Sequence, residues 1–304
     1  MTPGERTFED IYFTARDGLK LHARRYPGAD PAEGRPVLCL PGLTRNGRDF
    51  HDLAVALSRR PSGSRTVYTF DYRGRGLSEF DADWRDYTVG IEMLDVLDFM
   101  TLAGLEDAAV IGTSRGGLIT MLMAAAQPTN IGAAVLNDIG PVMEHDGLVR
   151  ISGYVGRIPL PISWADATRM VRELNKSHFP DVPDRQWEEV ARQWYNERNG
   201  KPAAGYDQKL RNALSVFYGP LPELWPQFEA LKRVPVLVVR GENSDVLSAA
   251  TVDKMRRRHP ALATVSVANQ GHAPLLKDEA TIEAIHHFLA ATDAGRSIAT
   301  LAIA

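Results

Sequence analysis

The sequence has a single cysteine among its 304 residues, so no disulfide bond can form within the chain. Cys39 lies in the apolar run 37–40, where we expect a buried and unreactive thiol. The first residues lack the basic and then apolar pattern of a signal peptide. No apolar run approaches the roughly 20 residues that a membrane span needs. These absences predict a cytoplasmic protein with no membrane partner.

The sequence also has no long run of charges of one sign, and its formal net charge is −3. A partner that is nucleic acid or an anionic membrane surface is therefore not expected. The densest basic cluster, residues 256–259, ends a helical pattern, where cations complement the helix dipole. With 44% hydrophobic and 24% charged residues, the composition is typical of a globular protein with a sizeable core.

Short apolar runs alternate with amphipathic stretches along most of the chain. Residues 8–26 alternate around the turn Arg16-Asp17-Gly18 and predict an antiparallel hairpin. Buried strands are predicted at 36–40, 66–71, 108–112, 132–137, 234–240 and 262–267. Helices are predicted at 50–59, 87–102, 116–127, 248–259 and 278–291. This alternation indicates the α/β class, with a mostly parallel sheet that helices cover on both faces.

Residues 141–231 interrupt this alternation and hold four of the five tryptophans. They show helical patterns at 164–175, 184–197 and 206–217 but no convincing strand. An insertion of about 90 residues is too long for a plain loop. We therefore expect a core formed by residues 1–140 and 232–304, and a helical cap formed by residues 141–231 over the carboxyl edge of the sheet.

The strongest chemical signal is Gly112-Thr113-Ser114-Arg115-Gly116, a Gly-x-Ser-x-Gly pattern between a predicted strand and a predicted helix. This strand–turn–helix context is the one that a nucleophile elbow requires. The two glycines would remove side chains that collide in the sharp turn, and Ser114 would lie at the helix N-terminus, where a developing anion is stabilised. The alternative interpretation is a glycine-rich turn with a helix-capping serine.

A serine hydroxyl needs a base, and the chain has eight histidines. His272 is the best candidate, because it follows the last predicted strand and precedes the last predicted helix. It would therefore lie at the same edge of the sheet as Ser114. A carboxylate must in turn orient the imidazole. We favour Asp245, which follows the strand at 234–240, over Glu242 and over Asp138, which ends an earlier strand and would give a rearranged triad.

In order along the chain, Ser114, Asp245 and His272 resemble the triads of the α/β-hydrolase superfamily. Leu40-Pro41-Gly42-Leu43 resembles that family's His-Gly-x oxyanion loop, although proline stands where histidine is frequent. The segment 71–78 (DYRGRGLS) resembles the family's Asp-x-Arg-Gly-x-Gly-x-Ser turn. The similarity covers about residues 8–140 and 232–291. It implies an eight-stranded sheet, a capped serine hydrolase, and an oxyanion hole formed by the backbone N–H groups of Leu43 and Arg115.

The resemblance implies hydrolysis of a carboxylic ester or lactone through an acyl-enzyme, with a small-molecule substrate, no metal and no cofactor. Cleavage of a carbon–carbon bond in a diketone, cofactor-free perhydrolase chemistry and a non-catalytic ligand receptor remain alternatives. A homo-oligomer is compatible with the sequence. For the Arg115 side chain we favour a structural ion pair with an acid such as Asp138. Residues that we expect near the substrate pocket are Arg45, Asp138, Met143, Tyr154 and Trp164.

Overall fold

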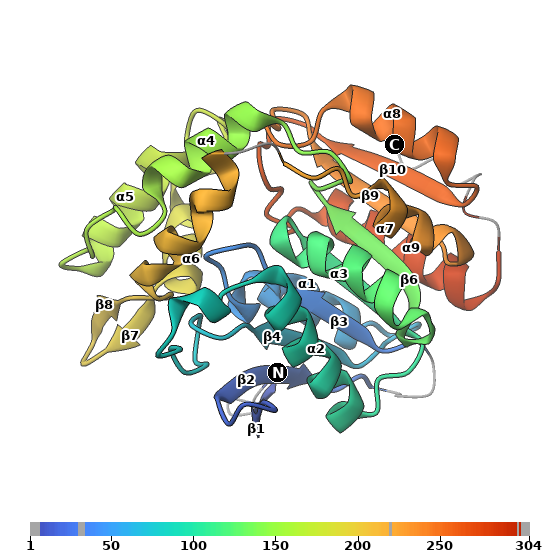
Figure 1. Cartoon of the computed structure of the whole chain (residues 1–304), viewed down its shortest axis with the longest axis horizontal. Coiled ribbons are helices and arrows are strands. Elements are labelled where there is room, and N and C mark those ends of the chain that lie inside the picture. Colours follow the sequence, from blue (N-terminus) through green and yellow to red (C-terminus); the bar gives the residue numbers. More distant parts are fainter. Residues whose placement is uncertain (1–6, 30–33, 219–220, 297, 299–304) are drawn as a thin grey trace.

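The computed structural model describes residues 7–29, 34–218, 221–296 and 298, and it is built around one eight-stranded sheet (Figure 1). The strand order is β1-β2-β4-β3-β5-β6-β9-β10. Strands β1 and β2 form the predicted hairpin, β2 also pairs antiparallel with β4, and all other neighbours are parallel. The predicted mostly parallel α/β sheet is confirmed. The strand bounds are β1 (Glu9–Thr14), β2 (Lys20–Tyr26), β3 (Val37–Leu40), β4 (Val67–Asp71), β5 (Ala108–Thr113), β6 (Ile131–Asn137), β9 (Val236–Gly241) and β10 (Leu262–Val267).

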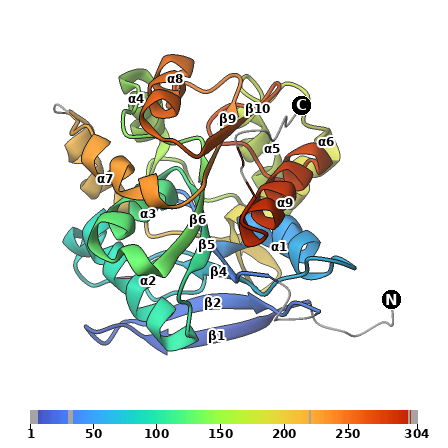
Figure 2. The same cartoon turned by 90° about the vertical axis from the view of Figure 1, so that its right-hand side faces the viewer.

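Helices cover both faces of this sheet (Figure 2). Alternate residues of β3 show the division: Leu38 packs in the core on the side of α2 (Val89–Ala103), α3 (Arg115–Ala126) and α8 (Ala249–Arg258). Its neighbour Cys39 packs on the side of α1 (His51–Ser58) and α9 (Glu279–Asp293). Because both faces are covered, the central strands have continuously apolar sequences. This made them recognisable in the sequence.

The segment between β6 and β9 holds the elements of the expected cap. Helices α5 (Trp164–Asn175) and α6 (Asp184–Trp194) pack on each other around a small core of their own. Helix α4 (His145–Tyr154) and the hairpin of β7 (Asn196–Arg198) and β8 (Lys201–Ala203) were not predicted, because α4 carries two glycines and each strand has three residues. The pattern at 206–217 forms the 3-10 helix η4 (Gln208–Tyr218).

The last part of this segment packs on the core. Helix α7 (Trp225–Glu229) and the 3-10 helix η5 (Ala230–Arg233) both contact α3. Three further 3-10 helices are η1 (Gly47–Phe50), η2 (Trp84–Asp86) and η3 (Pro128–Asn130). Among the described residues, no helix is long and apolar enough to cross a membrane. The outermost residues of the predicted core, 1–6 and 299–304, lie outside the described part of the chain.

Candidate active site

Ser114 lies in the tight turn between β5 and α3, as the motif predicted. Its backbone angles are φ 51° and ψ −112°, a region that L-residues rarely adopt and that often marks a functional site. A Cβ on Gly112 would lie 2.5 Å from the carbonyl carbon of Gly116, and a Cβ on Gly116 would lie 2.1 Å from the Leu40 carbonyl oxygen. Both glycines are therefore required by the close approach of backbone atoms in this turn.

Three segments of the chain meet at Ser114 to form a hydrogen-bonded relay. The Ser114 Oγ lies 2.8 Å from His272 Nε2. The other ring nitrogen, His272 Nδ1, lies 2.8 Å from Asp138 Oδ2. The imidazole is almost buried and the Asp138 carboxylate is completely buried. The relay therefore joins a hydroxyl, an imidazole and a carboxylate in a site that excludes most solvent.

Asp138 follows directly after β6 and is held tightly in place. Its backbone is left-handed, with φ 56°, and its N–H donates to the Val239 carbonyl at 2.7 Å. Its carboxylate also accepts hydrogen bonds from Gly241 N–H at 2.8 Å and from Ser244 Oγ at 2.5 Å. Several donors thus orient the carboxylate that faces His272.

The expected contact between Asp245 and His272 is not formed, and this prediction was wrong. The Asp245 carboxylate instead makes a bidentate ion pair with Arg150 on α4, at 2.6 and 2.8 Å. Burial alone would raise the pKa of Asp245, but the hydrogen bonds and charge of Arg150 hold it below the ordinary value. Glu242, the other rival, accepts from the Asn269 N–H at 3.3 Å. The loop after β9 therefore fastens the cap to the core.

The predicted oxyanion donors lie on two loops beside Ser114. Leu43 lines the same pocket as Ser114, and Arg115 is the first residue of α3. In the described part of the chain, neither backbone N–H is used in a main-chain hydrogen bond. The Leu43 carbonyl accepts from Arg75 Nε at 2.9 Å, which fixes that peptide group. Both N–H groups are thus available to an oxygen above the serine.

A buried carboxylate, Glu92, connects the turn at 71–78 to the start of α3. Its oxygens bind Arg75 Nη1 at 2.7 Å and Arg115 Nε at 2.5 Å. Burial would raise the pKa of Glu92, but the two guanidinium groups outweigh it and lower that pKa. The Arg115 side chain is therefore structural, as favoured from the sequence, but its acidic partner is Glu92 and not Asp138. Helical periodicity placed Glu92 on α2 without indicating that it would be buried.

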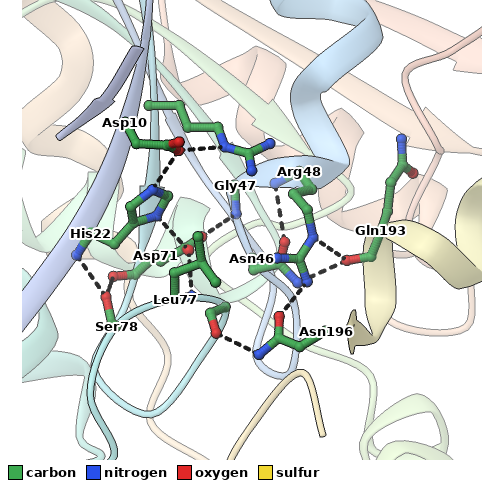
Figure 3. Close-up of polar contacts among 12 residues, drawn as sticks. Asp10, His22, Asn46, Gly47, Arg48, Asp71, Leu77, Ser78, Gln193 and Asn196 are labelled. Atoms are coloured by element: carbon green, nitrogen blue, oxygen red, sulfur yellow. Dashed lines mark hydrogen bonds and ion pairs between the residues drawn. The ribbon is translucent and has the colours of Figure 1, made fainter. Parts of the chain in front are cut away.

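A second polar network holds the loop at 43–47 in position (Figure 3). The buried Asp71 carboxylate accepts from the Gly47 N–H at 2.7 Å and from the Leu77 N–H at 2.9 Å. The ring nitrogens of His22 lie 2.8 Å from Asp71 and 2.9 Å from Asp10. Burial opposes ionisation of Asp71, but His22 and the two backbone donors outweigh it and lower its pKa. The turn at 71–78 therefore anchors the loop at 43–47.

The cap is bonded to the same loop (Figure 3). Asn46 Nδ2 and Arg48 Nε both donate to the Gln193 carbonyl, at 2.9 and 3.2 Å. Arg48 Nη2 also donates to Asn196 Oδ1 at 2.8 Å. Residues 193–196 at the end of α6 are thus fixed against the loop at 43–47.

A pocket lies above the relay and is lined by both cap and core residues. Arg45 and Tyr154 line it, as expected. Arg45 binds Asp49 at 2.6 Å, and its guanidinium carbon lies 3.6 Å from the centre of the Trp194 ring. The remaining core and cap residues around the pocket are Gly42, Leu43, Thr44, Phe50, Thr113, Ser114, Ile151, Asn175, Phe179, Gln193, His272, Ala273, Pro274, Leu275, Leu276 and Lys277.

Three residues predicted near the pocket do not line it. Met143 packs against the core, and Trp164 packs in the cap and donates from Nε1 to the Gly200 carbonyl at 3.1 Å. Asp138 lies behind His272. Trp194 and Lys277 were missed, because nothing in their local patterns shows that they face a pocket. Among the described residues, no group of three or more His, Cys, Asp or Glu side chains is placed to hold a metal.

Comparison with known proteins agrees with the fold. The profile of the alpha/beta hydrolase fold family matches residues 35–279. The chain is 33% identical over 280 residues to the 3-hydroxybutyrate-oligomer hydrolase of Cupriavidus necator, covering 86% of this chain and 91% of that protein. It is 26% identical to the 2-(acetamidomethylene)succinate hydrolase of Mesorhizobium japonicum, covering 86% and 90%. The crystal structure of an alpha/beta hydrolase from Novosphingobium aromaticivorans matches with a TM-score of 0.85 and 41% identity, over 94% of this chain and 99% of that one.

Proposed function

The chain belongs to the alpha/beta hydrolase fold family, and from this premise we propose that it is a serine hydrolase that cleaves a carboxylic ester. In this proposal Ser114 is the nucleophile, His272 the general base and Asp138 the orienting acid. The relay of two 2.8 Å hydrogen bonds carries the proposal, because a serine hydroxyl becomes a useful nucleophile only beside an oriented base.

In the first half of the reaction, His272 Nε2 takes the proton from Ser114 Oγ as the oxygen attacks the ester carbonyl. The Asp138 carboxylate keeps the other ring nitrogen protonated and stabilises the imidazolium. The carbonyl oxygen becomes an oxyanion, which accepts hydrogen bonds from the N–H groups of Leu43 and Arg115. Each such donor is worth roughly 3 kcal/mol of the barrier. The imidazolium then protonates the departing alkoxide, and an acyl-enzyme remains.

In the second half, a water molecule replaces the alcohol. His272 takes a proton from the water, which attacks the acyl carbonyl, and the same two N–H groups hold the second oxyanion. When the tetrahedral intermediate collapses, the imidazolium returns a proton to Ser114 Oγ and the carboxylic acid is released. The atoms balance with water as the only co-substrate.

A linear ester is the preferred substrate in this proposal. The relative from Cupriavidus necator is named for the hydrolysis of 3-hydroxybutyrate oligomers, and it matches this chain over most of both lengths. A lactone would use the same groups, and so would a diketone cleaved at a carbon–carbon bond. A panel of linear esters, lactones and diketones, assayed under the same conditions, separates these substrates by kcat/KM.

The proposal is tested with a fluorophosphonate probe, which reacts with activated serines. We expect labelling and ester turnover in the native protein, and loss of both in Ser114→Ala with little change in thermal stability. Ser177→Ala is the matched control, because the Ser177 hydroxyl is exposed and its one hydrogen bond within the described residues is to its neighbour His178, at 3.0 Å. Labelling and turnover that persist in Ser114→Ala would refute the proposed mechanism.

A further inference from the structure

A second pocket adjoins the pocket above Ser114 and is not used by the steps described so far. It is lined by residues of α5, by the end of α6 and by residues within 204–208. Thr44, Tyr154 and Trp194 line both pockets, so these three residues form a dividing wall between them. The second pocket therefore begins where the reactive pocket ends.

The two pockets differ in charge. The reactive pocket is lined in part by Arg45, Asp49 and Lys277, together with His272. None of the described residues that line the second pocket is charged. An ionised group bound there would lose its hydration without gaining a counter-charge, which is costly. The second pocket is therefore suited to an uncharged ligand group.

The second pocket is also largely aliphatic and reaches the surface. Ile158, Met170 and Leu174 contribute to its walls. Leu160 lines it too and is 47% exposed, so the pocket extends from the dividing wall to the outside of the cap. A pocket lined by such side chains gains free energy by burying methylene groups. Because it begins at the reactive pocket and reaches an exposed residue, a chain suits it better than a compact ring.

The dividing wall is fixed in position, which makes the second pocket a formed site. Trp194 stacks against the Arg45 guanidinium at 3.6 Å. The residue before it, Gln193, is bonded through its carbonyl to Asn46 and Arg48 of the oxyanion loop (Figure 3). On the cap side, the Tyr206 hydroxyl accepts from the Gly156 N–H at 2.9 Å.

We propose that this second pocket is a substrate subsite that binds the aliphatic chain of an elongated ester while its scissile carbonyl lies at Ser114. The inference rests on the proposed ester hydrolysis and names the substrate class for it. An elongated ester would place its reacting group between Ser114 and the oxyanion donors and extend its uncharged chain past Thr44 and Trp194. Each methylene buried there contributes roughly a threefold to fourfold gain in kcat/KM.

One donor in the dividing wall points to the chemistry of that chain. Trp194 Nε1 is buried and has no hydrogen-bond acceptor in the described part of the structure. Buried N–H groups are normally paired. A carbonyl oxygen on a chain that passes the wall would supply the acceptor. We therefore expect a chain that carries such an oxygen to be preferred over a hydrocarbon chain of the same length.

The subsite is tested by filling it. Met170→Trp places a larger side chain in the second pocket. We expect kcat/KM for p-nitrophenyl octanoate to fall at least tenfold, while the value for p-nitrophenyl acetate stays within twofold. Glu173→Trp is the control, because this residue is exposed on the same helix and lines neither pocket. A series of alkyl acetates, in which the alcohol chain grows, shows whether the acyl or the alcohol chain occupies the subsite.

If folded Met170→Trp leaves unchanged both the ratio of octanoate to acetate turnover and the ratio of octyl acetate to methyl acetate turnover, the subsite is overturned. Met170→Ala provides the opposite change, and we expect it to move the preferred chain length upward by about two carbons; no shift would also count against the inference. If the native protein turns over neither ester, the proposed function fails by itself. The subsite is then measured by calorimetric binding of methyl octanoate to Ser114→Ala, with and without Met170→Trp.

The expected hydrogen bond from the Trp194 indole N–H to the chain is tested by a separate measurement. A set of oxo-alkanoate esters is compared with the plain ester of equal length, with the carbonyl moved along the chain. We expect one position to be preferred about fivefold, and Trp194→Phe to remove that preference while retaining the ring. If no position is preferred, the indole N–H does not recognise the chain.

Discussion

Replacing Asp138 with asparagine tests how the imidazole is held. The native carboxylate accepts hydrogen bonds from three donors, namely the His272 ring, the Gly241 N–H and the Ser244 hydroxyl. An amide has one acceptor oxygen, and its NH2 group would face at least one of these donors. If the amide NH2 faces His272, the ring must accept at Nδ1 and carry its proton on Nε2. It then cannot take the proton from Ser114.

The magnitude follows from this change of tautomer. The equivalent substitution in serine proteases lowers kcat about 10⁴-fold, and we expect a loss of roughly 10³- to 10⁴-fold here. Loss of a hydrogen bond to a buried charged group costs about 1.5–3 kcal/mol, so the free energy of unfolding should fall by that amount. Steady-state turnover of p-nitrophenyl acetate and urea unfolding measure the two effects.

Asp245→Asn is the matched comparison, since it was the carboxylate expected from the sequence. Its pair with Arg150 is about one-quarter exposed on both sides. Exposed ion pairs contribute about 0.2–1 kcal/mol to the free energy of unfolding, and the contribution of this pair should lie near the upper end of that range. We expect kcat within about threefold of the native value. If Asp245→Asn loses activity while Asp138→Asn retains most of it, the assignment of the acid is reversed.

Three further predictions concern Glu92 and Gly116, which lie close to Ser114, and His286 on α9. Glu92→Gln leaves two buried guanidinium groups without their carboxylate, so it should cost about 3–5 kcal/mol in urea unfolding and lower kcat; an unchanged midpoint would contradict the bridging role. Gly116→Ala brings a Cβ within 2.1 Å of the Leu40 carbonyl oxygen and should cost at least about 3 kcal/mol or prevent folding, which thermal unfolding measures. Burial and nearby arginines lower the pKa of His286 from 6.5 to about 4, so its neutral form is favoured on folding and unfolding free energy should fall as pH drops from 6.5 toward 4; His286→Gln should flatten that dependence, and an identical pH profile would argue against it.

The sheet and the sharp turn at Ser114 could be predicted because their signals are local. The strand before Ser114 is continuously apolar, and the glycines on either side are dictated by contacts within the same turn. His272 could be found because only one histidine follows a strand at the right edge. These residues needed no knowledge of how distant loops pack.

The acid could not be chosen from the sequence, because two carboxylates follow strands that end at the same edge of the sheet. Asp138 and Asp245 are both placed suitably by topology. The choice depends on the left-handed backbone of Asp138 and on Arg150, which pairs with Asp245 from a cap helix that the sequence did not predict. Glu92 was missed for a similar reason, since its two arginine partners come from separate loops.

The position of the acid has a consequence for engineering. Ser114 and Asp138 follow adjacent strands, β5 and β6, and both precede the segment that forms the cap. A chimaera that exchanges residues from α4 to η4 for the corresponding part of another hydrolase would leave that pair covalently untouched. Asp245 would then be the core residue that binds the new cap. A grafted cap would need a cationic side chain in the place of Arg150 to form the same ion pair. Substrate range could in this way be exchanged as a module while the reactive groups stay native.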